Sequence, residues 1–342
     1  MKPRILLLDT YYPEAIRALP VNPAMTYQSN LDAILYQSFG TADFYSRSLR
    51  ALGWEAEDVI WNHEQLSSMR PYWTRLTRHE HEVIFLQDLN VILPASFYST
   101  VVAGQCSCPW PGDDNIRKCD VIFTSFPHYV PRIEALGVKA VYNPLAFDPV
   151  VIQRVIEQGF PQIIENERPF DVTFIGGVGN PGHWRRGMET LNAVAEAIPT
   201  FKWWGYGADL LPSSSALRQN YQGEAWGLDM YRVMLQSKIV LNRHGEVAEG
   251  HANNMRLFEA TGCGALLLTE WCENASLRTL FDSFECESYV DAADAISEIN
   301  FYLNDDITRQ AFAKNGQSRT LRDHTYAQRM KTVSNTLLEM LK

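Results

Sequence analysis

Short, predominantly apolar runs recur along the chain, separated by longer segments in which apolar residues return every three or four positions. The short runs lie at 5–8, 83–86, 121–123, 172–175, 201–204, 239–241 and 265–268. Runs of this length are typical of strands buried on both faces, whereas the longer pattern is typical of amphipathic helices, here at 41–52, 185–197 and 228–236. Strands that alternate with helices predict an α/β fold built on parallel sheets.

The alternation restarts once, which predicts two Rossmann-like domains. A stretch rich in Pro, Glu and Asn ends at Pro169 and is followed at once by a fresh strand. We therefore place an N-terminal domain at 1–165 and a C-terminal domain at 166–323. Residues 324–342 carry apolar side chains at helical spacing, so we expect one amphipathic helix that packs back on the first domain.

Composition narrows the class of protein. The 342 residues suit two domains, and the 46% hydrophobic fraction is ample for their cores. The formal net charge of -10 argues against a nucleic-acid partner. No apolar run approaches the roughly 20 residues of a membrane-spanning helix, and residues 1–4 lead directly into a strand pattern. We expect a cytoplasmic protein, for which peripheral membrane contact stays open.

The cysteine spacing gives little support for a metal site. Six cysteines are scattered along the chain, which predicts free thiols rather than a disulfide framework. Cys106, Cys108 and Cys119 lie closest together, but they lack a fourth ligand and do not match zinc-binding spacings. We therefore expect no bound metal.

A glycine-rich stretch at 174–186 follows a predicted strand and opens a predicted helix. It contains G-x-G-x-x-G at Gly177, Gly179 and Gly182, a pattern of dinucleotide-binding sites. The acid that such sites carry about 20 residues later is missing at 201–204, which disfavours NAD. Backbone N–H groups and two arginines suit a diphosphate instead; the alternative is a turn with exposed arginines. The candidate ligands are Gly177, His183, Arg185 and Arg186.

Two further loops leave predicted strands at the carboxyl edge, where open α/β sheets bind ligands. Gly205 and Tyr206 follow the strand at 201–204. Gly223 lies in a loop before a helix, a place suited to backbone recognition of a nucleobase. The aromatic residues of both loops have burial in the core as their alternative role.

The loop at 241–251 brings two histidines, an arginine and two acids together, and each histidine is either a ligand or a structural residue. The segment at 253–270 has the pattern of a helix capped by asparagine, with Arg256 and Glu259 one turn apart, a glycine stop and a buried strand. A cation near a helix N-terminus suits phosphate, although an i,i+3 pair can also be a surface salt bridge. The candidate ligands here are His244, His251, Asn253, Asn254, Arg256 and Glu259.

In this order the motifs resemble those of the GT-B glycosyltransferases, and more closely the CgeB-like branch related to the group 1 enzymes. The resemblance rests on Phe-Ile-Gly-Gly with His-Trp-Arg-Arg at 183–186, Trp-Gly-Tyr-Gly at 204–207 and Asn-Met-Arg-Leu-Phe-Glu at 254–259. The first domain fits more loosely, through a glycine loop at 40–44 and the stretch at 120–144.

The resemblance implies a nucleotide-sugar donor held by the second domain, an acceptor held by the first, and chemistry in a cleft between parallel sheets. Glu259 would bind the ribose hydroxyls, and Arg186 and Arg256 the phosphates, with help from Arg185 and Asn254. Retaining group 1 enzymes usually carry a glutamate eight positions before the ribose-binding one, where this chain has His251. The stereochemical outcome therefore stays open.

Such an enzyme needs no metal where positive side chains and a helix N-terminus neutralise the departing diphosphate. If it inverts, a base in the first domain must take the acceptor proton. Asp88, just past the strand at 83–86, is the first candidate, and His128 and Asp43 follow; each has a structural role as its alternative. We expect a metal-independent glycosyltransferase, as in polysaccharide biosynthesis, acting on a glycan, lipid, protein or small molecule. The alternatives are a GT-B sugar-nucleotide epimerase, a non-catalytic nucleotide-sugar-binding protein and, least favoured, an NAD-dependent enzyme.

Overall fold

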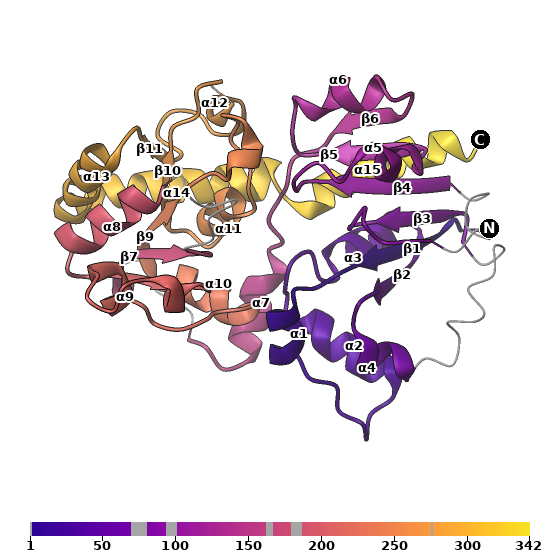
Figure 1. Ribbon diagram of the computed structural model, residues 1–342, viewed down its shortest axis with the longest axis horizontal. Helices are drawn as coiled ribbons and strands as arrows, with labels where there is room; N and C mark the ends of the chain where they lie inside the picture. Colours follow the sequence, from indigo (N-terminus) through magenta and orange to yellow (C-terminus); the bar gives the residue numbers. More distant parts are fainter. Residues whose placement is uncertain (1, 70–80, 94–100, 162–166, 179–186, 275) are drawn as a thin grey trace. The chain divides into compact units, whose positions relative to one another are not determined.

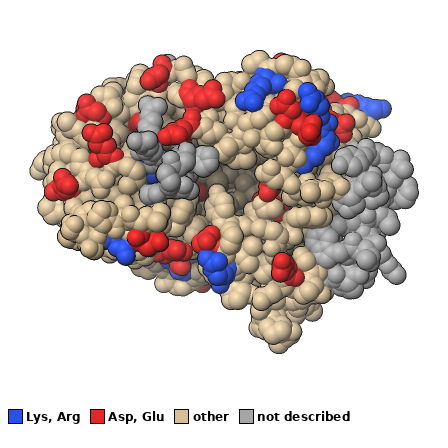
Figure 2. All heavy atoms as spheres, in the orientation of Figure 1, with Lys and Arg blue, Asp and Glu red and all other residues tan. Residues whose placement is uncertain are grey.

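The computed structural model describes residues 2–69, 81–93, 101–161, 167–178, 187–274 and 276–342 (Figure 1). The chain forms two compact units. Unit 1 comprises Met1–Leu145 and Tyr326–Lys342, and unit 2 comprises Ala146–Thr325. Within the ranges given above, no helix combines the length and apolar character that crossing a bilayer requires. On the face drawn in Figure 2, acidic and basic side chains are scattered in small groups.

The division between the units falls earlier in the chain than the sequence suggests, at 145/146 rather than at 165/166. Helix α7 (Val150–Glu157) groups with unit 2 because it packs against α10 (Leu228–Leu235). Arg232 on α10 donates a hydrogen bond to the side chain of Gln158, the residue that ends α7.

Unit 1 is built on a parallel sheet. Its strands are β1 (Arg4–Asp9), β2 (Glu55–Ile60), β3 (Val83–Leu86), β4 (Val101–Cys106), β5 (Val121–Thr124) and β6 (Lys139–Tyr142). Its helices are α1 (Pro13–Ala18), α2 (Tyr27–Tyr36), α3 (Phe44–Ala51), α4 (Glu64–Ser68), α5 (Asp113–Arg117), α6 (Tyr129–Glu134) and α15 (Tyr326–Met340). The strand order is β2-β1-β3-β4-β5-β6. The predicted apolar runs in this unit are β1, β3 and β5, and each run is buried, as a strand covered on both faces requires.

The strands β1 and β3 are neighbours, although β2 lies between them in the chain. The chain leaves β1 toward β2 on one side and leaves β3 toward β4 on the other. Leu8 pairs with Leu86, and the Gln87 N–H donates to the Leu8 carbonyl at 2.8 Å. The segments after β1 and β3, with Asp9 and Asp88, therefore leave the same edge of the sheet at a topological switch point.

The C-terminal helix α15 packs on α3, which confirms the predicted return of the chain to the first domain. The Trp54 indole Nε1 donates to Ser334 Oγ at 2.8 Å, and the rings of Phe44 and Tyr326 stack with centroids 5.4 Å apart. Arg329 Nε donates to the Pro144 carbonyl at 2.8 Å. These contacts fix α15 to unit 1 along its length.

Unit 2 is also built on a parallel sheet. Its strands are β7 (Phe170–Ile175), β8 (Phe201–Trp204), β9 (Ser237–Asn242), β10 (Leu266–Glu270) and β11 (Glu287–Tyr289). Its helices, besides α7 and α10, are α8 (Met188–Ala197), α9 (Ala216–Gln219), α11 (Arg256–Gly262), α12 (Leu277–Leu280), α13 (Ala292–Asn304) and α14 (Asp306–Asp323), with 3-10 turns η3 (Ala208–Leu210) and η4 (Glu246–Ala248). The strand order is β11-β10-β9-β7-β8. The predicted pair of Rossmann-like parallel sheets is confirmed.

Candidate functional site

Unit 2 has its own switch point, between β7 and β9. The chain passes from β7 to β8 on one side of the sheet and from β9 to β10 on the other. The segments that follow β7 and β9 begin with Gly176 and Arg243. Ligands of open parallel sheets bind in the crevice at such a point. Most of the predicted donor-binding residues lie in the loops at this edge.

The segments after β7 and β8 run side by side as paired backbones. The Gly176 N–H donates to the Trp204 carbonyl at 3.0 Å, and the Val178 N–H donates to the Tyr206 carbonyl at 2.9 Å. A Cβ atom at Gly205, where φ is +144°, would lie 2.0 Å from the Gly176 carbonyl oxygen. Gly205 is therefore glycine because another backbone lies against it, which is a structural role.

The Tyr206 side chain covers Gly177 and lies beside the ring of Trp226. A Cβ atom at Gly177 would lie 2.5 Å from the Tyr206 ring. The ring of Tyr206 is nearly parallel to that of Trp226, with an interplanar angle of 6° and centroids 6.2 Å apart. The carbonyl of Gly223 accepts a hydrogen bond from the Gly205 N–H at 3.0 Å. Four predicted residues, Gly177, Gly205, Tyr206 and Gly223, therefore lie together beside an aromatic surface.

Arg243 connects the two sides of the switch point, a role that the sequence did not single out. Its side chain is buried, its Nη2 donates to the Gly177 carbonyl at 2.6 Å, and its guanidinium lies 5.5 Å from the centre of the Phe174 ring. Burial lowers the pKa of Arg243 to about 10. The available signal was its position directly after a strand in a loop of polar residues.

His244 is held by β10 and by the segment before α11. Its backbone N–H donates to Glu270 Oε2 at 3.1 Å, and its Nδ1 accepts from the Asn253 N–H at 3.4 Å. Its Nε2 lies 3.2 Å from Thr269 Oγ1. Because Nδ1 accepts, we assign the proton of the neutral ring to Nε2, which then donates to the threonine. His244 thus fixes the loop after β9 against β10.

Asn254 caps α11 one residue before the helix boundary. Its Oδ1 accepts from the Leu257 N–H at 3.2 Å, and its Nδ2 donates to Asn242 Oδ1 and to the Arg243 carbonyl, both at 2.9 Å. An asparagine that satisfies an orphan N–H group stabilises a helix start. The same side chain ties the start of α11 to the end of β9.

Arg256 and Glu259 form a buried pair between α11 and α10. Arg256 Nη1 lies 2.7 Å from Glu259 Oε2, and the two side chains are only 15% and 4% exposed. Glu259 Oε1 accepts from the Tyr231 hydroxyl at 3.2 Å, and Arg256 Nη1 also meets the sulfur of Met234 at 3.2 Å. Arg256 Nε is buried and has no hydrogen-bond partner among the described residues. The alternative of a surface salt bridge is therefore excluded.

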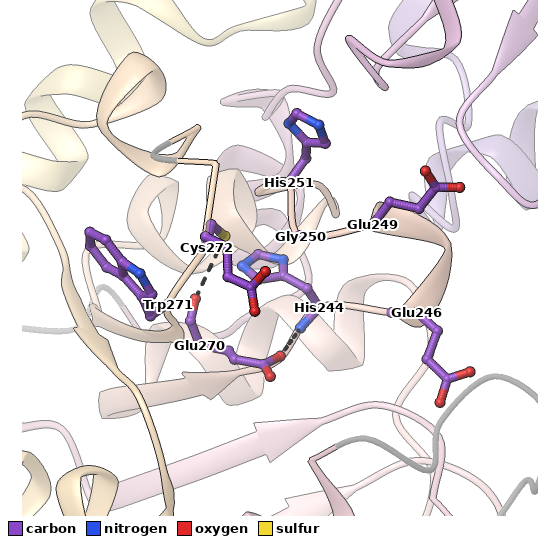
Figure 3. Close-up of a pocket in the computed structure, with 10 residues that line it drawn as sticks. His244, Glu246, Glu249, Gly250, His251, Glu270, Trp271 and Cys272 are labelled. Carbon is purple, nitrogen blue, oxygen red and sulfur yellow. Dashed lines mark hydrogen bonds between the residues drawn. The ribbon is translucent and has the colours of Figure 1, made fainter. Parts of the chain in front are cut away.

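A cavity of about 200 Å³ opens at the exits of β9 and β10 (Figure 3). Figure 3 shows Glu270 bonded to His244, while His251 and Glu249 project from the loop in other directions. Glu249 has a left-handed backbone, with φ of 47°. The lining residues are His244, Gly245, Glu246, Glu249, Gly250, His251, Glu270, Trp271, Cys272 and Glu273. Carboxylates repel phosphate and accept hydrogen bonds from hydroxyl groups, so this cavity suits a polyol better than a diphosphate.

Part of the predicted donor site falls outside the described residues. His183, Arg185 and Arg186 lie in the segment 179–186. The roles predicted for these three side chains stay predictions.

The three candidate bases lie in different parts of unit 1. Asp88 is at the switch point, where its carboxylate accepts from Thr10 Oγ1 at 2.7 Å and from the Asn90 N–H at 2.9 Å. His128 follows β5, which is separated from β1 by β3 and β4, and its ring packs against those of Phe126 and Tyr129. Asp43 precedes α3. Asp88 is the candidate that lies at the switch point, where a ligand crevice is expected.

The cysteines near residue 110 are thiols. Cys106 and Cys119 are buried and Cys108 is exposed. Burial raises the pKa of both Cys106 and Cys119 to about 12. In the described ranges, no three His, Cys, Asp or Glu side chains are grouped as ligands of one metal ion.

Two parallel Rossmann-like sheets, with a polar, partly cationic edge on the second, define the GT-B fold. Residues 185–335 match a protein family described as "Glycosyl transferase-like". The finer CgeB-like assignment stays a prediction. No curated protein sequence matches the chain.

Solved structures share this fold at low sequence identity. Sucrose-phosphate synthase from Thermosynechococcus elongatus is 12% identical, with 99% of each chain covered and a TM-score of 0.57. Anabaena HepE in complex with UDP and glucose is 12% identical, with 98% of this chain and 100% of HepE covered and a TM-score of 0.56. A Listeria monocytogenes protein assigned as a UDP-N-acetylglucosamine 2-epimerase is 9% identical, with 100% and 97% covered and a TM-score of 0.56.

Proposed function

We propose that the chain is a metal-independent glycosyltransferase that moves a sugar from a nucleoside diphosphate to a hydroxyl group of a glycan, lipid, protein or small-molecule acceptor. The observation that carries the proposal is the buried Arg256–Glu259 pair, in which Arg256 Nε has no partner within the described part of the chain. A buried donor without a partner costs free energy unless a ligand or water completes it.

In the proposed donor site, Arg256 binds the diphosphate together with Arg185 and Arg186. Glu259 binds the ribose diol: two of the roughly four acceptor positions of its carboxylate are in use, by Arg256 and Tyr231. The faces of Tyr206 and Trp226 suit a nucleobase, which stacks on aromatic rings. These roles together require a nucleoside diphosphate rather than a free phosphate.

The cavity at the exits of β9 and β10 is proposed to hold the sugar ring. Four of its lining residues are glutamates, so it favours a neutral sugar over one that carries a carboxylate. A bound metal is not part of the proposal, because arginine side chains supply the positive charge that a departing diphosphate needs.

The relatives of known structure support a nucleotide-sugar donor. HepE was solved with UDP and glucose, and sucrose-phosphate synthase is named for a sugar phosphate product. We extend the first of these ligand classes to this chain, without specifying the sugar.

Binding of UDP measured by calorimetry tests the donor site. We expect Arg256→Ala to weaken UDP binding by about 1–3 kcal/mol, the size of a lost charge-assisted hydrogen bond. Arg232→Ala is the matched control, because Arg232 also belongs to an i,i+3 pair but on a more exposed surface of the same unit. An unchanged affinity in a folded Arg256→Ala protein would remove Arg256 from the phosphate site. Binding and turnover that persist in EDTA are expected; their loss, restored by Mg²⁺, would refute metal independence.

An epimerase is the second candidate function, favoured by the fold similarity to the Listeria protein. The two functions differ in what happens to the donor alone. Incubation of UDP-N-acetylglucosamine without acceptor, followed by NMR, gives a second sugar nucleotide from an epimerase. A transferase gives at most slow hydrolysis. Binding with no conversion in the presence of an acceptor panel would instead indicate a nucleotide-sugar-binding protein.

A further inference from the structure

Asp9, at the end of β1, lies in a group of polar side chains on the switch point of unit 1. Its Oδ1 accepts from the Thr10 N–H at 2.8 Å, and the Thr10 hydroxyl donates to Asp88 Oδ2 at 2.7 Å. Thr41 Oγ1 lies 3.4 Å from Asp9 Oδ2 and is also bonded to Gln87. Two carboxyl groups from adjacent strands are thus linked through one threonine.

The two carboxyl groups differ in how well they are satisfied. Asp88 accepts three hydrogen bonds of 3.0 Å or less, one from Thr10 and two from the backbone and side chain of Asn90. Three of the roughly four acceptor positions of this carboxylate are therefore in use. Asp9 Oδ2 has one long contact, to the Thr41 hydroxyl. That hydroxyl has a single proton, which it also donates to the side-chain oxygen of Gln87. Asp9 Oδ2 is therefore the oxygen of this pair that is better prepared to accept a proton.

A buried hydroxyl next to this pair points to a ligand or water. Tyr11 is 3% exposed, and its hydroxyl has no hydrogen-bond partner among the residues described. Burial raises the pKa of the Tyr11 hydroxyl. The negative charges of Asp9, Asp58 and Asp43 raise this pKa further. An uncompensated buried hydroxyl is costly, and a substrate hydroxyl in the crevice would satisfy it.

The loop that brings Thr41 to Asp9 has an unusual backbone. Ser38, Gly40 and Ala42 have φ values of 60°, 60° and 41°. The first and last are not glycine, and left-handed conformations of such residues cost free energy that functional sites commonly retain. The loop is thus held in one conformation beside the carboxyl group.

The surroundings of Asp9 make its ionised form costly. Burial raises its pKa to about 7, and the charges of Asp88 and Asp58 add to the effect, while the Thr10 and Thr41 hydrogen bonds oppose it. The titratable groups that face Asp9 are Asp88 after β3, Asp58 on β2, and the hydroxyls of Tyr11 and Tyr45. Asp43, before α3, acts on Tyr11 and Asp58. A general base is most effective when its pKa lies near the working pH.

We propose that Asp9 is the catalytic base of the transfer reaction and that Asp88 and Thr10 position it. Asp9 Oδ2 takes the proton of the acceptor hydroxyl, and the acceptor oxygen forms a bond to the anomeric carbon. The bond from that carbon to the nucleoside diphosphate breaks, and the diphosphate leaves with the electron pair. Direct displacement of this kind inverts the anomeric centre. The inference rests on the proposed function.

Acceptors that need no base separate the role of Asp9 from a structural one. We would measure transfer from UDP-glucose to a panel of p-nitrophenyl glycosides, and to azide, which is already an anion at neutral pH. Asp9→Asn is expected to lower transfer to the sugar hydroxyls by about a hundredfold or more, the size of a general-base contribution. Transfer to azide should change less than about threefold, since that reaction has no proton to remove.

Calorimetry with UDP and thermal unfolding are run on each variant, so that misfolding is distinguished from lost catalysis. As an independent variant, Asp88→Asn should move the acidic limb of kcat/KM for sugar hydroxyls to lower pH, because a negative neighbour of Asp9 is removed. Azide transfer should lack that limb in the wild-type protein.

Each outcome is decisive. Full transfer to hydroxyls by a folded Asp9→Asn protein overturns the inference, as does parallel loss of hydroxyl and azide transfer. Loss of hydroxyl transfer in Asp88→Asn alone would assign the base to Asp88 and also overturn it. A retained anomeric configuration refutes direct displacement. Wild-type protein that binds no UDP and converts no UDP-glucose would instead refute the proposed function on which the inference rests.

Discussion

Removal of one partner from the Arg256–Glu259 pair tests how strongly unit 2 depends on it. In Arg256→Met, the Glu259 carboxylate stays 4% exposed and keeps one donor, the Tyr231 hydroxyl at 3.2 Å. Breaking a buried ion pair in this way costs about 3–5 kcal/mol. Because Tyr231 still donates, we expect the lower end, about 3 kcal/mol. Unit 2 spans residues 146–325, and for a domain of this size that corresponds to a fall of about 6–12 °C in melting temperature.

Removal of both partners should be less harmful than removal of one. Arg256→Met combined with Glu259→Leu leaves no buried charge and one orphaned hydroxyl, on Tyr231, so a loss of about 1–2 kcal/mol is expected. The control is Asp229→Asn, in a pair of the same i,i+3 spacing whose Asp229 side chain is 67% exposed. That change should cost about 0.5 kcal/mol.

Urea unfolding followed by tryptophan fluorescence, with calorimetry as a second probe, gives the four free energies. A double variant less stable than Arg256→Met would refute the view that Glu259 is a buried charge in need of its partner. A cost below about 1 kcal/mol for Arg256→Met would place the pair with ordinary surface salt bridges.

Two further predictions concern the loops at the strand exits. Gly205→Ala should lower the melting temperature of unit 2 and weaken UDP binding more than tenfold, because the new Cβ would lie 2.0 Å from the Gly176 carbonyl oxygen. Gly223→Ala is the control for backbone strain alone, because Gly223 has a φ of +106° but open space where a Cβ atom would lie. Similar losses in the two variants would contradict a steric cause. The stability of unit 1 should fall as pH rises from about 4 to about 7, because the folded state, with the Asp9 pKa raised to about 7, holds a proton that an unfolded aspartate has already released. Asp9→Asn should reduce this slope and raise the melting temperature at pH 8, while Asp58, whose pKa burial raises to about 6, supplies the slope that remains. A slope equal to that of the wild-type protein would show that Asp9 does not titrate in this range.

The central strands could be predicted from the sequence, whereas several others could not. The runs at 5–8, 83–86 and 172–175 became β1, β3 and β7 because strands covered on both faces must be continuously apolar. β2 and β6 are edge strands with charged and exposed positions, so they lack that pattern. β4 is central but carries Gly104, where a Cβ atom would lie 2.4 Å from Leu89. Close packing there requires a glycine, which weakens the strand signal.

The sequence predicted where the site lies better than it predicted the hydrogen bonds and the burial of its side chains. Local motifs indicated Asn254 as a helix cap and Arg256 with Glu259 as a pair, because cap and i,i+3 contacts depend on short separations. The burial of that pair depends on α10, and the bond from Arg243 to Gly177 joins residues 66 positions apart. Asp9 was missed for the same reason, since its partners Thr41 and Asp88 come from distant segments. Such contacts follow from the strand order, which local patterns do not determine.

Gly177 has contacts on two sides, with the Tyr206 ring over its Cα and with Arg243 on its carbonyl. In the proposed donor site Tyr206 lies on the nucleobase side of this segment, and Arg243 holds the same segment from the end of β9. A ligand fragment that orders this segment by binding on one side therefore removes the entropic cost of ordering it for a fragment that binds on the other side. Uridine and pyrophosphate, offered as separate molecules, should then bind cooperatively, and the intact nucleotide should gain this coupling in addition to the benefit of its covalent link.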